Sequence, residues 1–89
     1  MSVWTVYLAR CADGSLYCGI SSDVYRRETE HNKVRSKASR YCWSRRPIRM
    51  VWLCPCPDKP TAMRRERWVK GLSKSDKELL ALGKLDMEE

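Results

Sequence analysis

The chain has 89 residues, the length of one small domain with a modest hydrophobic core. No apolar run approaches the roughly 18 residues of a transmembrane helix, and the first residues lack the basic and apolar parts of a secretory signal. The 18 Lys and Arg residues against 11 Asp and Glu give a net charge of +7. This charge favours an anionic partner, nucleic acid before an acidic membrane, although a basic protein without such a partner is the alternative. We expect one cytoplasmic domain over residues 1–89, with its core at about 4–80.

The cysteine content favours reduced thiols. Five cysteines are an odd number, and no export signal accompanies them, so a disulfide framework is disfavoured. Cys54 and Cys56 are close in sequence, but zinc sites need a second such pair or a nearby histidine. We interpret all five as small hydrophobic core residues: Cys11, Cys18, Cys42, Cys54 and Cys56.

The first part of the chain predicts a β-hairpin. Residues 3–11 and 15–20 are rich in β-branched and aromatic types, and the Ala-Asp-Gly sequence at 12–14 is a turn signal. A two-residue turn would mix polar and apolar side chains on both faces of the hairpin. A three-residue loop, which pairs residues whose numbers sum to 26, separates them into one apolar and one polar face. This loop also suits Gly14, which would take a left-handed conformation.

The same register has a chemical consequence. It places Tyr7 opposite Gly19 and Tyr17 opposite Ala9, so that two phenols lie diagonally on the polar face. The small residues opposite them leave space, and we therefore expect a shallow site that carries two hydroxyl groups. The alternative is a pair of half-exposed sheet tyrosines without a function.

A helix is expected to follow the hairpin, from Asp23 to about Asn32. Ser-Ser-Asp at residues 21–23 is an N-cap signal. Arg27 and His31 are four residues apart and share a helix face, one turn from Val24. We interpret this face as turned toward the protein, although both side chains would face water in the alternative.

A long basic segment comes next. No Asp or Glu occurs between His31 and Pro57, whereas an ordinary surface mixes both signs of charge. Basic residues interleaved with aromatic ones suit phosphate contacts combined with base stacking. The segment has no clear period, so we expect a mostly irregular loop in which the aromatic residues either stack on bases or anchor the loop to the core. The candidate nucleic-acid-binding residues are Lys33, Arg35, Lys37, Arg40, Tyr41, Trp43, Arg45 and Arg46.

One further strand and two helices are predicted in the C-terminal half. Residues 49–54 are typical of a strand, which we expect Pro55 to end. Thr61 is the expected N-cap of a helix over 62–72. The Ser-Asp-Lys-Glu sequence at 75–78 is a capping box and predicts the start of a last helix.

Glu66 is the candidate acid of this half. It is the only acidic residue in a helix that contains Arg64, Arg65, Arg67 and Lys70, and it lies on or beside the core-facing stripe. An unpaired buried carboxylate is unfavourable, so Glu66 needs a partner. That partner is either an arginine of the fold or a divalent cation.

Together these residues resemble a known family. The order of the motifs resembles the GIY-YIG nuclease domain, and most closely its small stand-alone bacterial type, over roughly residues 4–80. The residues that carry the resemblance are Val6-Tyr7-Leu8, Tyr17-Cys18-Gly19, Arg27, His31 and Glu66. Departures are Thr5 and Cys18 at motif positions, a connection after His31 that lacks glycine, and no late asparagine that we can place.

The resemblance implies an α/β (α+β) fold with a three-stranded antiparallel sheet flanked by helices. It implies metal-dependent hydrolysis of nucleic-acid phosphodiesters, with one Mg²⁺ or Mn²⁺ held by Glu66. Tyr7 would activate the attacking water, Tyr17 and Arg27 would bind the scissile phosphate, and His31 would assist proton transfer or orient Tyr7.

We therefore expect an endonuclease that uses a divalent cation and no small-molecule cofactor. The aromatic residues of the basic segment favour single-stranded or structurally distorted DNA as its substrate. The alternative is a non-catalytic nucleic-acid-binding module with the same fold. A membrane-surface protein is disfavoured, because the sequence lacks a basic amphipathic helix with a broad apolar face.

Overall fold

A three-stranded antiparallel sheet forms the centre of the molecule. The computed structural model describes residues 3–86. The strand order is β2-β1-β3, so β1 is central and the other two strands form the edges. The strands are β1 (Trp4–Arg10), β2 (Leu16–Ser21) and β3 (Arg49–Cys56). This arrangement confirms the predicted α/β (α+β) fold class.

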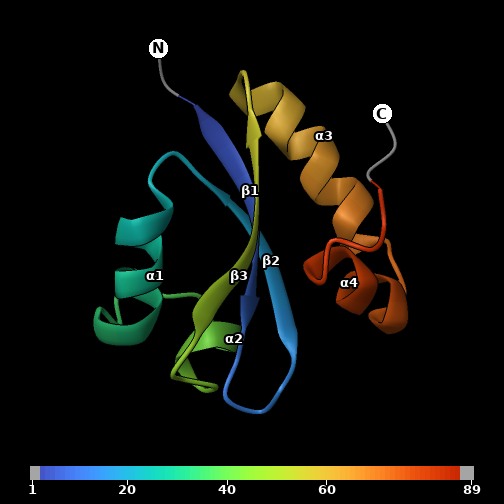
Figure 1. Cartoon of the computed structure of the whole chain (residues 1–89). Coiled ribbons are helices and arrows are strands. Elements are labelled where there is room, and N and C mark those ends of the chain that lie inside the picture. Colours follow the sequence, from blue (N-terminus) through green and yellow to red (C-terminus); the bar gives the residue numbers. More distant parts are fainter. Residues whose placement is uncertain (1–2, 87–89) are drawn as a thin grey trace.

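Helices cover both faces of the sheet. In Figure 1, α1 lies to the left of the sheet, while α3 and α4 lie to the right. The short α2 packs beside α1 and contributes to the same side of the core. None of the described helices is long and apolar enough to cross a membrane. The helices are α1 (Val24–Lys33), α2 (Arg40–Trp43), α3 (Lys59–Lys70) and α4 (Lys74–Ala81).

The hairpin between β1 and β2 has the register that the sequence predicted. Tyr7 pairs with Gly19, and Ala9 pairs with Tyr17. The three-residue loop is closed by Gly14, whose φ of 87° is the left-handed conformation that only glycine adopts without strain. The strands therefore alternate their side chains between the two faces as expected.

The face that carries the tyrosines differs from the expectation. We predicted an open polar face, but the side chains of Tyr7 and Ala9 are fully buried there, against Cys42 and Ile48. The residues that bury this face come from the segment after α1, which showed no hydrophobic period. The opposite face forms the second part of the core with α3 and α4: Val6, Leu8, Cys18, Cys56, Ala62, Val69 and Leu80.

Two predicted boundaries are wrong for reasons that concern proline and caps. β3 continues through Pro55 to Cys56, because an edge strand tolerates a residue that lacks an N–H donor. The N-cap of α3 is Asp58 and not Thr61, since the Asp58 carboxylate accepts a hydrogen bond from the Thr61 amide. The helix thus begins three residues earlier than predicted and includes Pro60 in its first turn.

The start of α4 also differs. Ser73, two residues before the predicted capping box, is the N-cap, and its hydroxyl accepts a hydrogen bond from the Asp76 amide at 3.1 Å.

One more polar contact fixes α4 to the sheet. The Arg10 guanidinium donates to both carboxylate oxygens of Glu78, at 2.6 and 2.7 Å, which is the bidentate geometry that arginine favours.

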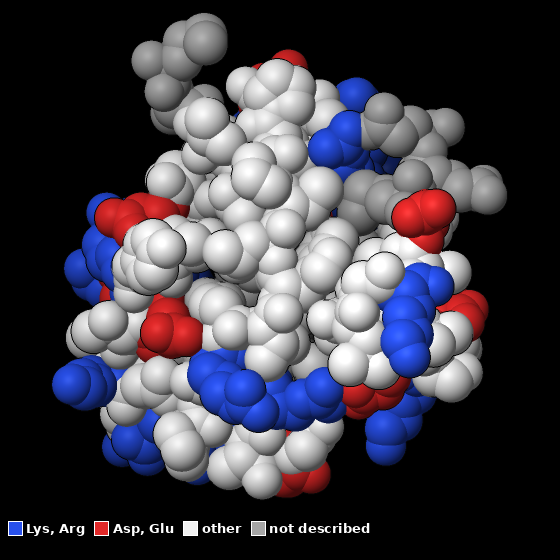
Figure 2. All heavy atoms as spheres, in the orientation of Figure 1, with Lys and Arg blue, Asp and Glu red and all other residues white. Residues whose placement is uncertain are grey.

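Positive charge is unevenly distributed over the surface. In Figure 2, Lys and Arg side chains gather across the lower half of the visible face, from the side of α1 to the side of α4. The upper middle of the same face is formed mostly by uncharged residues. On this face, the basic side chains therefore lie mainly at the end of the sheet near the hairpin loop.

The cap of α4 can be tested with a matched pair of serines. We expect Ser73→Ala to lower the free energy of unfolding by about 1 kcal/mol, because the Asp76 amide loses its acceptor. Ser75→Ala, two residues later on the exposed first turn, loses only the exposed 3.2 Å contact between its hydroxyl and that of Ser73 and should change it by less than about 0.5 kcal/mol. Urea unfolding followed by circular dichroism measures both. Equal losses would show that Ser73 is not the cap.

Candidate functional site

The Tyr7 phenol lies against the backbone of β2 at Gly19. A Cβ atom built at Gly19 would approach the Tyr7 hydroxyl oxygen to 2.5 Å and its ring to 2.6 Å, closer than real Cβ atoms come to other atoms. Only glycine leaves room for the phenol at this position. The pairing of Tyr7 with Gly19 thus fixes where the hydroxyl lies.

His31 of α1 bonds to this hydroxyl. Its Nε2 lies 2.9 Å from the Tyr7 oxygen, while its Nδ1 accepts a hydrogen bond from the Ser39 amide at 3.3 Å. Burial and the nearby Arg27 charge lower the pKa of His31 to about 4, so the ring is neutral at pH 7. A neutral ring that accepts at Nδ1 carries its proton on Nε2. His31 therefore donates to the Tyr7 oxygen and holds no free lone pair for the Tyr7 proton.

Tyr7 itself is a weak acid in the free protein. Burial raises the pKa of Tyr7 above its ordinary value, the neighbouring Tyr17 adds to the rise, and the Arg27 guanidinium opposes it. Tyr7 is thus a neutral phenol at pH 7. Its deprotonation requires additional positive charge close to the oxygen, beyond that of Arg27.

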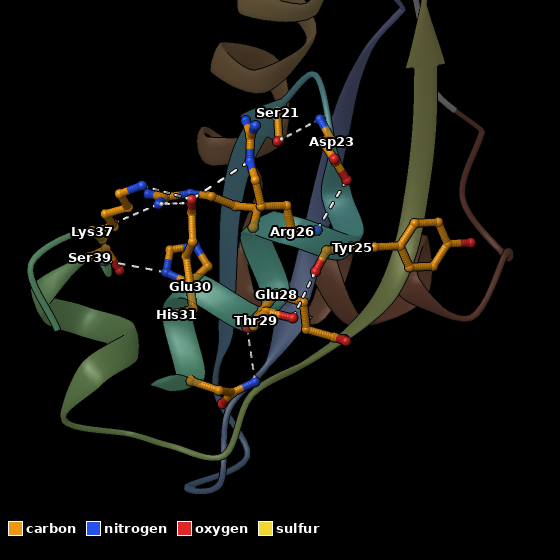
Figure 3. A network of polar contacts seen from close by, with 12 residues as sticks. Ser21, Asp23, Tyr25, Arg26, Glu28, Thr29, Glu30, His31, Lys37 and Ser39 are labelled. Carbon is orange, nitrogen blue, oxygen red and sulfur yellow. Dashed lines mark hydrogen bonds and ion pairs between the residues drawn. The ribbon is translucent and has the colours of Figure 1, made fainter. Parts of the chain in front are cut away.

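A network of charges around Glu30 positions Arg27. Arg27 Nη1 donates to the Lys37 carbonyl oxygen at 2.6 Å and to a Glu30 carboxylate oxygen at 3.3 Å. Glu30 also pairs with Arg26 at 3.6 Å and with Lys37 at 3.9 Å. Figure 3 shows Glu30 and His31 pointing from α1 toward the segment of Lys37 and Ser39, whereas Tyr25 points away. The network ties α1 to the basic segment, and the Arg27 side chain remains 27 % exposed.

Aromatic rings extend the site beyond Tyr7. The Tyr17 ring lies 6.3 Å from the Tyr7 ring and 5.5 Å from the His31 ring, measured between centroids. Tyr41 of α2 stacks on Tyr17 at 5.8 Å, and the Arg45 guanidinium lies 3.7 Å from the Tyr41 ring centroid. The structure therefore brings together four of the predicted catalytic residues, Tyr7, Tyr17, Arg27 and His31, and it places Tyr41, predicted as a nucleic-acid-binding residue, beside them.

Glu66 approaches from the opposite face of the sheet. It lies near Cys18, which faces α3, whereas the neighbouring residues Tyr17 and Gly19 face α1. Burial raises the pKa of the Cys18 thiol to about 12, the Glu66 carboxylate adds to the rise, and Lys70 opposes it. Because β2 is an edge strand, the phenols and the carboxylate lie on two sides of one sheet edge.

The partner of Glu66 is a lysine. Lys70 Nζ lies 3.2 Å from Glu66 Oε2, one helical turn away, and the side chains of Lys70 and Glu66 are 54 % and 22 % exposed. Neither partner that we considered, an arginine or a cation, matches this contact. Such an accessible i,i+4 pair contributes little stability and is easily displaced by a stronger ligand of the carboxylate.

The donor set restricts the metal that this region can hold. No group of three or more His, Cys, Asp or Glu side chains with metal-binding geometry occurs among residues 3–86. The single carboxylate of Glu66 is enough for Mg²⁺, which commonly takes one or two protein carboxylates and completes its shell with water and substrate phosphate oxygens. The thiols belong to the protein interior instead, where Cys11, Cys18, Cys42 and Cys56 are buried.

The basic segment is more ordered than we predicted. It contains α2, and its two aromatic residues each contact an arginine: Arg45 lies over Tyr41, and Arg46 lies over Trp43 at 3.4 Å. Lys33, Arg35, Lys37 and Arg40 are exposed. The aromatic residues therefore both anchor the segment and support cationic groups at the surface.

Sequence reasoning missed three residues that hold the site together. Asn32 bonds to both the amide and the carbonyl of Ile48, and so fixes the end of the basic segment. Ser39 orients His31, and Glu30 pairs with Arg27. Only Glu30 had a signal in the sequence, its i,i+3 spacing from Arg27; the other two contacts join segments that no local pattern connects.

Comparisons with known proteins agree with this fold. Residues 3–79 match the family model of the GIY-YIG catalytic domain. A UPF0213 protein of Vibrio cholerae is 48 % identical, over 92 % of this chain and 80 % of that protein. A UPF0213 protein of Desulfotalea psychrophila is 46 % identical, over 86 % and 69 %. The solution NMR structure of a UPF0213 protein from Bacillus halodurans superposes with a TM-score of 0.59 at 40 % identity, covering 92 % of this chain and 85 % of that one.

The contact between Tyr7 and Gly19 can be tested by adding one methyl group. We expect Gly19→Ala to lower the free energy of unfolding by about 1–3 kcal/mol, because its Cβ would overlap the Tyr7 hydroxyl. Gly71→Ala is the control, since a Cβ there meets only carbonyl oxygens at 3.5 Å or more. Urea unfolding compares the two variants. Equal stability of both would contradict the close contact.

The state of His31 gives a pH-dependent prediction. Between pH 6.5 and about 4 the unfolded chain binds a proton that folded His31 does not, so the stability should fall as the pH drops through this window. His31→Gln should lack this contribution. Urea unfolding at several pH values compares the two proteins, and NMR follows the single imidazole. A His31 that titrates near 6.5 in the folded protein would overturn this assignment.

Proposed function

The chain belongs to the GIY-YIG catalytic domain family, and from that premise we propose that it is a divalent-metal-dependent endonuclease that hydrolyses DNA phosphodiester bonds. The observation that supports this most is the position of the Tyr7 oxygen. It is buried over Gly19, with a donor from His31 and the Arg27 charge beside it. Burial alone would require a hydrogen-bond partner for this phenol, so the Arg27 charge beside it is the part of the arrangement that favours a catalytic role.

Tyr7 is the proposed base that activates the attacking water. The Nε2–H of His31 donates to its oxygen, which stabilises the phenolate over the phenol. In the free protein burial outweighs this help and keeps the pKa of Tyr7 high. A divalent cation bound beside the phosphate would supply the additional positive charge that deprotonation of Tyr7 requires. We assign His31 the orienting role, because its tautomer leaves it unable to accept the Tyr7 proton.

Arg27 and Tyr17 are the proposed phosphate ligands. The guanidinium of Arg27 is planar and always charged, which suits two parallel hydrogen bonds to phosphate oxygens. Its Nη1 is held by the Lys37 carbonyl and Glu30, so the group is positioned before substrate arrives. The half-buried Tyr17 lies beside Tyr7 on the same face and supplies a second donor.

Glu66 is the proposed ligand of one Mg²⁺ or Mn²⁺. Lys70 pairs with Oε2 in an exposed contact, so a cation can compete for the carboxylate. When bound, the cation would neutralise charge on the phosphate and stabilise the leaving oxygen. The chain contributes a single carboxylate, which leaves the other coordination positions to water and substrate oxygens.

The basic segment supports single-stranded or distorted DNA as the substrate. The guanidinium groups of Arg45 and Arg46 lie over the rings of Tyr41 and Trp43, an arrangement to which an unpaired base can add by stacking. Exposed Lys33, Arg35 and Arg40 extend the positive surface for backbone contacts. One observation favours a non-catalytic binding module instead: Glu66 is already paired with Lys70.

Glu66→Gln separates the two functions. We expect this variant to lose metal-dependent cleavage of labelled DNA by about 100-fold or more, because the amide binds Mg²⁺ poorly. Its affinity for uncut DNA in EDTA should not fall. Asp86→Asn, which removes an exposed acid outside the sheet, is the matched control and should cleave like the wild type.

The panel should contain single-stranded, duplex, flap and junction substrates, each with Mg²⁺ and with Mn²⁺. Tyr7→Phe, which keeps the ring in the core, should lose cleavage as well. A wild type that binds all substrates without cutting any of them would favour the binding module. Unchanged cleavage by Glu66→Gln would remove Glu66 from the mechanism.

A further inference from the structure

A cavity of about 290 Å³ lies next to the site, where the start of β2 meets α2 and α4. Its wall contains two lysines of α4, one aromatic residue of α2, and the first residues after the hairpin loop. The lining residues are Ser15, Leu16, Tyr41, Lys74, Lys77 and Glu78. The cavity therefore spans the same sheet edge that separates the phenols from Glu66.

The charges of this cavity favour an anion. Among residues 3–86, neither Lys74 nor Lys77 has a carboxylate within ion-pairing distance. The one acid in the wall, Glu78, is occupied by the bidentate contact with Arg10, which lowers the pKa of its carboxyl and offsets its charge. Lys74 also lies near this carboxylate, but the wall carries two lysines against one acid, so its net charge is positive.

The cavity is connected to the site through an aromatic contact. Tyr41 lines the cavity and stacks on Tyr17, the proposed phosphate ligand. Lys77 also lies close enough to Cys18 to oppose the rise in the pKa of that thiol, as Lys70 does. Lysines of α3 and α4 therefore follow β2 from the region of Glu66 to the cavity.

The spacing along β2 suits a polynucleotide. Leu16 in the cavity wall and Gly19 beneath the Tyr7 phenol are three residues apart, which corresponds to about 10 Å of strand. Tyr41 already contacts Tyr17 and Arg45, so its ring serves as a fixed wall rather than as a free platform for a base. A backbone phosphate with its sugar matches the charge and the size of the cavity better than a stacked base.

We propose that Lys74 and Lys77 form a phosphate subsite that holds the DNA strand one or two nucleotides from the cleaved bond. This inference rests on the proposed function for the identity of the polymer, and its own basis is the cavity. The strand would then follow the edge of β2, from α4 past Tyr17 to the Tyr7 hydroxyl. No residue of the basic segment other than Tyr41 lines this subsite.

The test uses two double variants that lose the same charge. Binding of a fluorescent oligo-dT to the full chain in EDTA is measured at several salt concentrations, for wild type, Lys74→Ala/Lys77→Ala and Lys59→Ala/Lys84→Ala. The control lysines lie at the start of α3 and after α4. We expect the slope of log affinity against log salt to decrease in magnitude by about 0.7–1.4 for the first variant, which is the loss of one or two phosphate contacts. The control should keep the wild-type slope.

A second measurement locates the ligand. In NMR titrations of the wild type, oligo-dT should shift the amides of Ser15 and Leu16, and dTMP or inorganic phosphate should shift them only at much higher concentration. Equal slopes for the two double variants would overturn the subsite, as would dTMP or phosphate binding there as tightly as the oligomer. Both measurements exclude metal, so a wild type without nuclease activity would refute the proposed function and leave this result intact.

Discussion

The approach of the Tyr7 phenol to the backbone at Gly19 is the constraint on which the site depends. It requires that position 19 has no side chain and that the hairpin pairs residues whose numbers sum to 26. A slip of one residue would turn Tyr7 to the other face, away from His31. The three-residue loop closed by Gly14 fixes this register. The turn between β1 and β2 therefore determines whether the Tyr7 hydroxyl reaches His31, a hydrogen-bond partner that lies 24 residues away in the sequence.

The sequence predicts the strands and the register of the hairpin, but it does not predict which side chains cover the face that carries Tyr7. Alternation of polar and apolar residues, together with a glycine in the loop, predicts the register, because both are local signals. The burial of Tyr7 depends on Cys42 and Ile48, which come from a segment without period and reach the sheet only in the folded chain. The predicted starts of α3 and α4 were wrong for a related reason. Several neighbouring residues could cap each helix, and the hydrogen bond of one backbone amide, to Asp58 or to Ser73, decides between them.

The same distinction applies to the site. The shared face of Arg27 and His31 follows from helical spacing, whereas the tautomer of His31 follows from the Ser39 amide, a contact that sequence does not reveal. That contact has the larger chemical effect, since it turns His31 from a possible base into a donor. For Glu66 the missed signal was local. Lys70 lies four residues after Glu66, and a lysine at this spacing on a helix is the simplest partner for a half-buried glutamate.

The position of the functional groups on two sides of β2 restricts how a substrate can reach them. Helices α1 and α3 cover the two faces and Tyr7 itself is buried, so a ligand that contacts both the half-buried Tyr17 and Glu66 must approach from beyond the outer edge of the sheet. Edge strands normally carry a risk of pairing with other chains, and lysines beside them reduce it. Here Lys70 and Lys77 lie near that edge, and the same charges attract a polyanion. A DNA strand that follows this edge must present single phosphates to it. A flexible or distorted DNA backbone does this more readily than a stiff duplex.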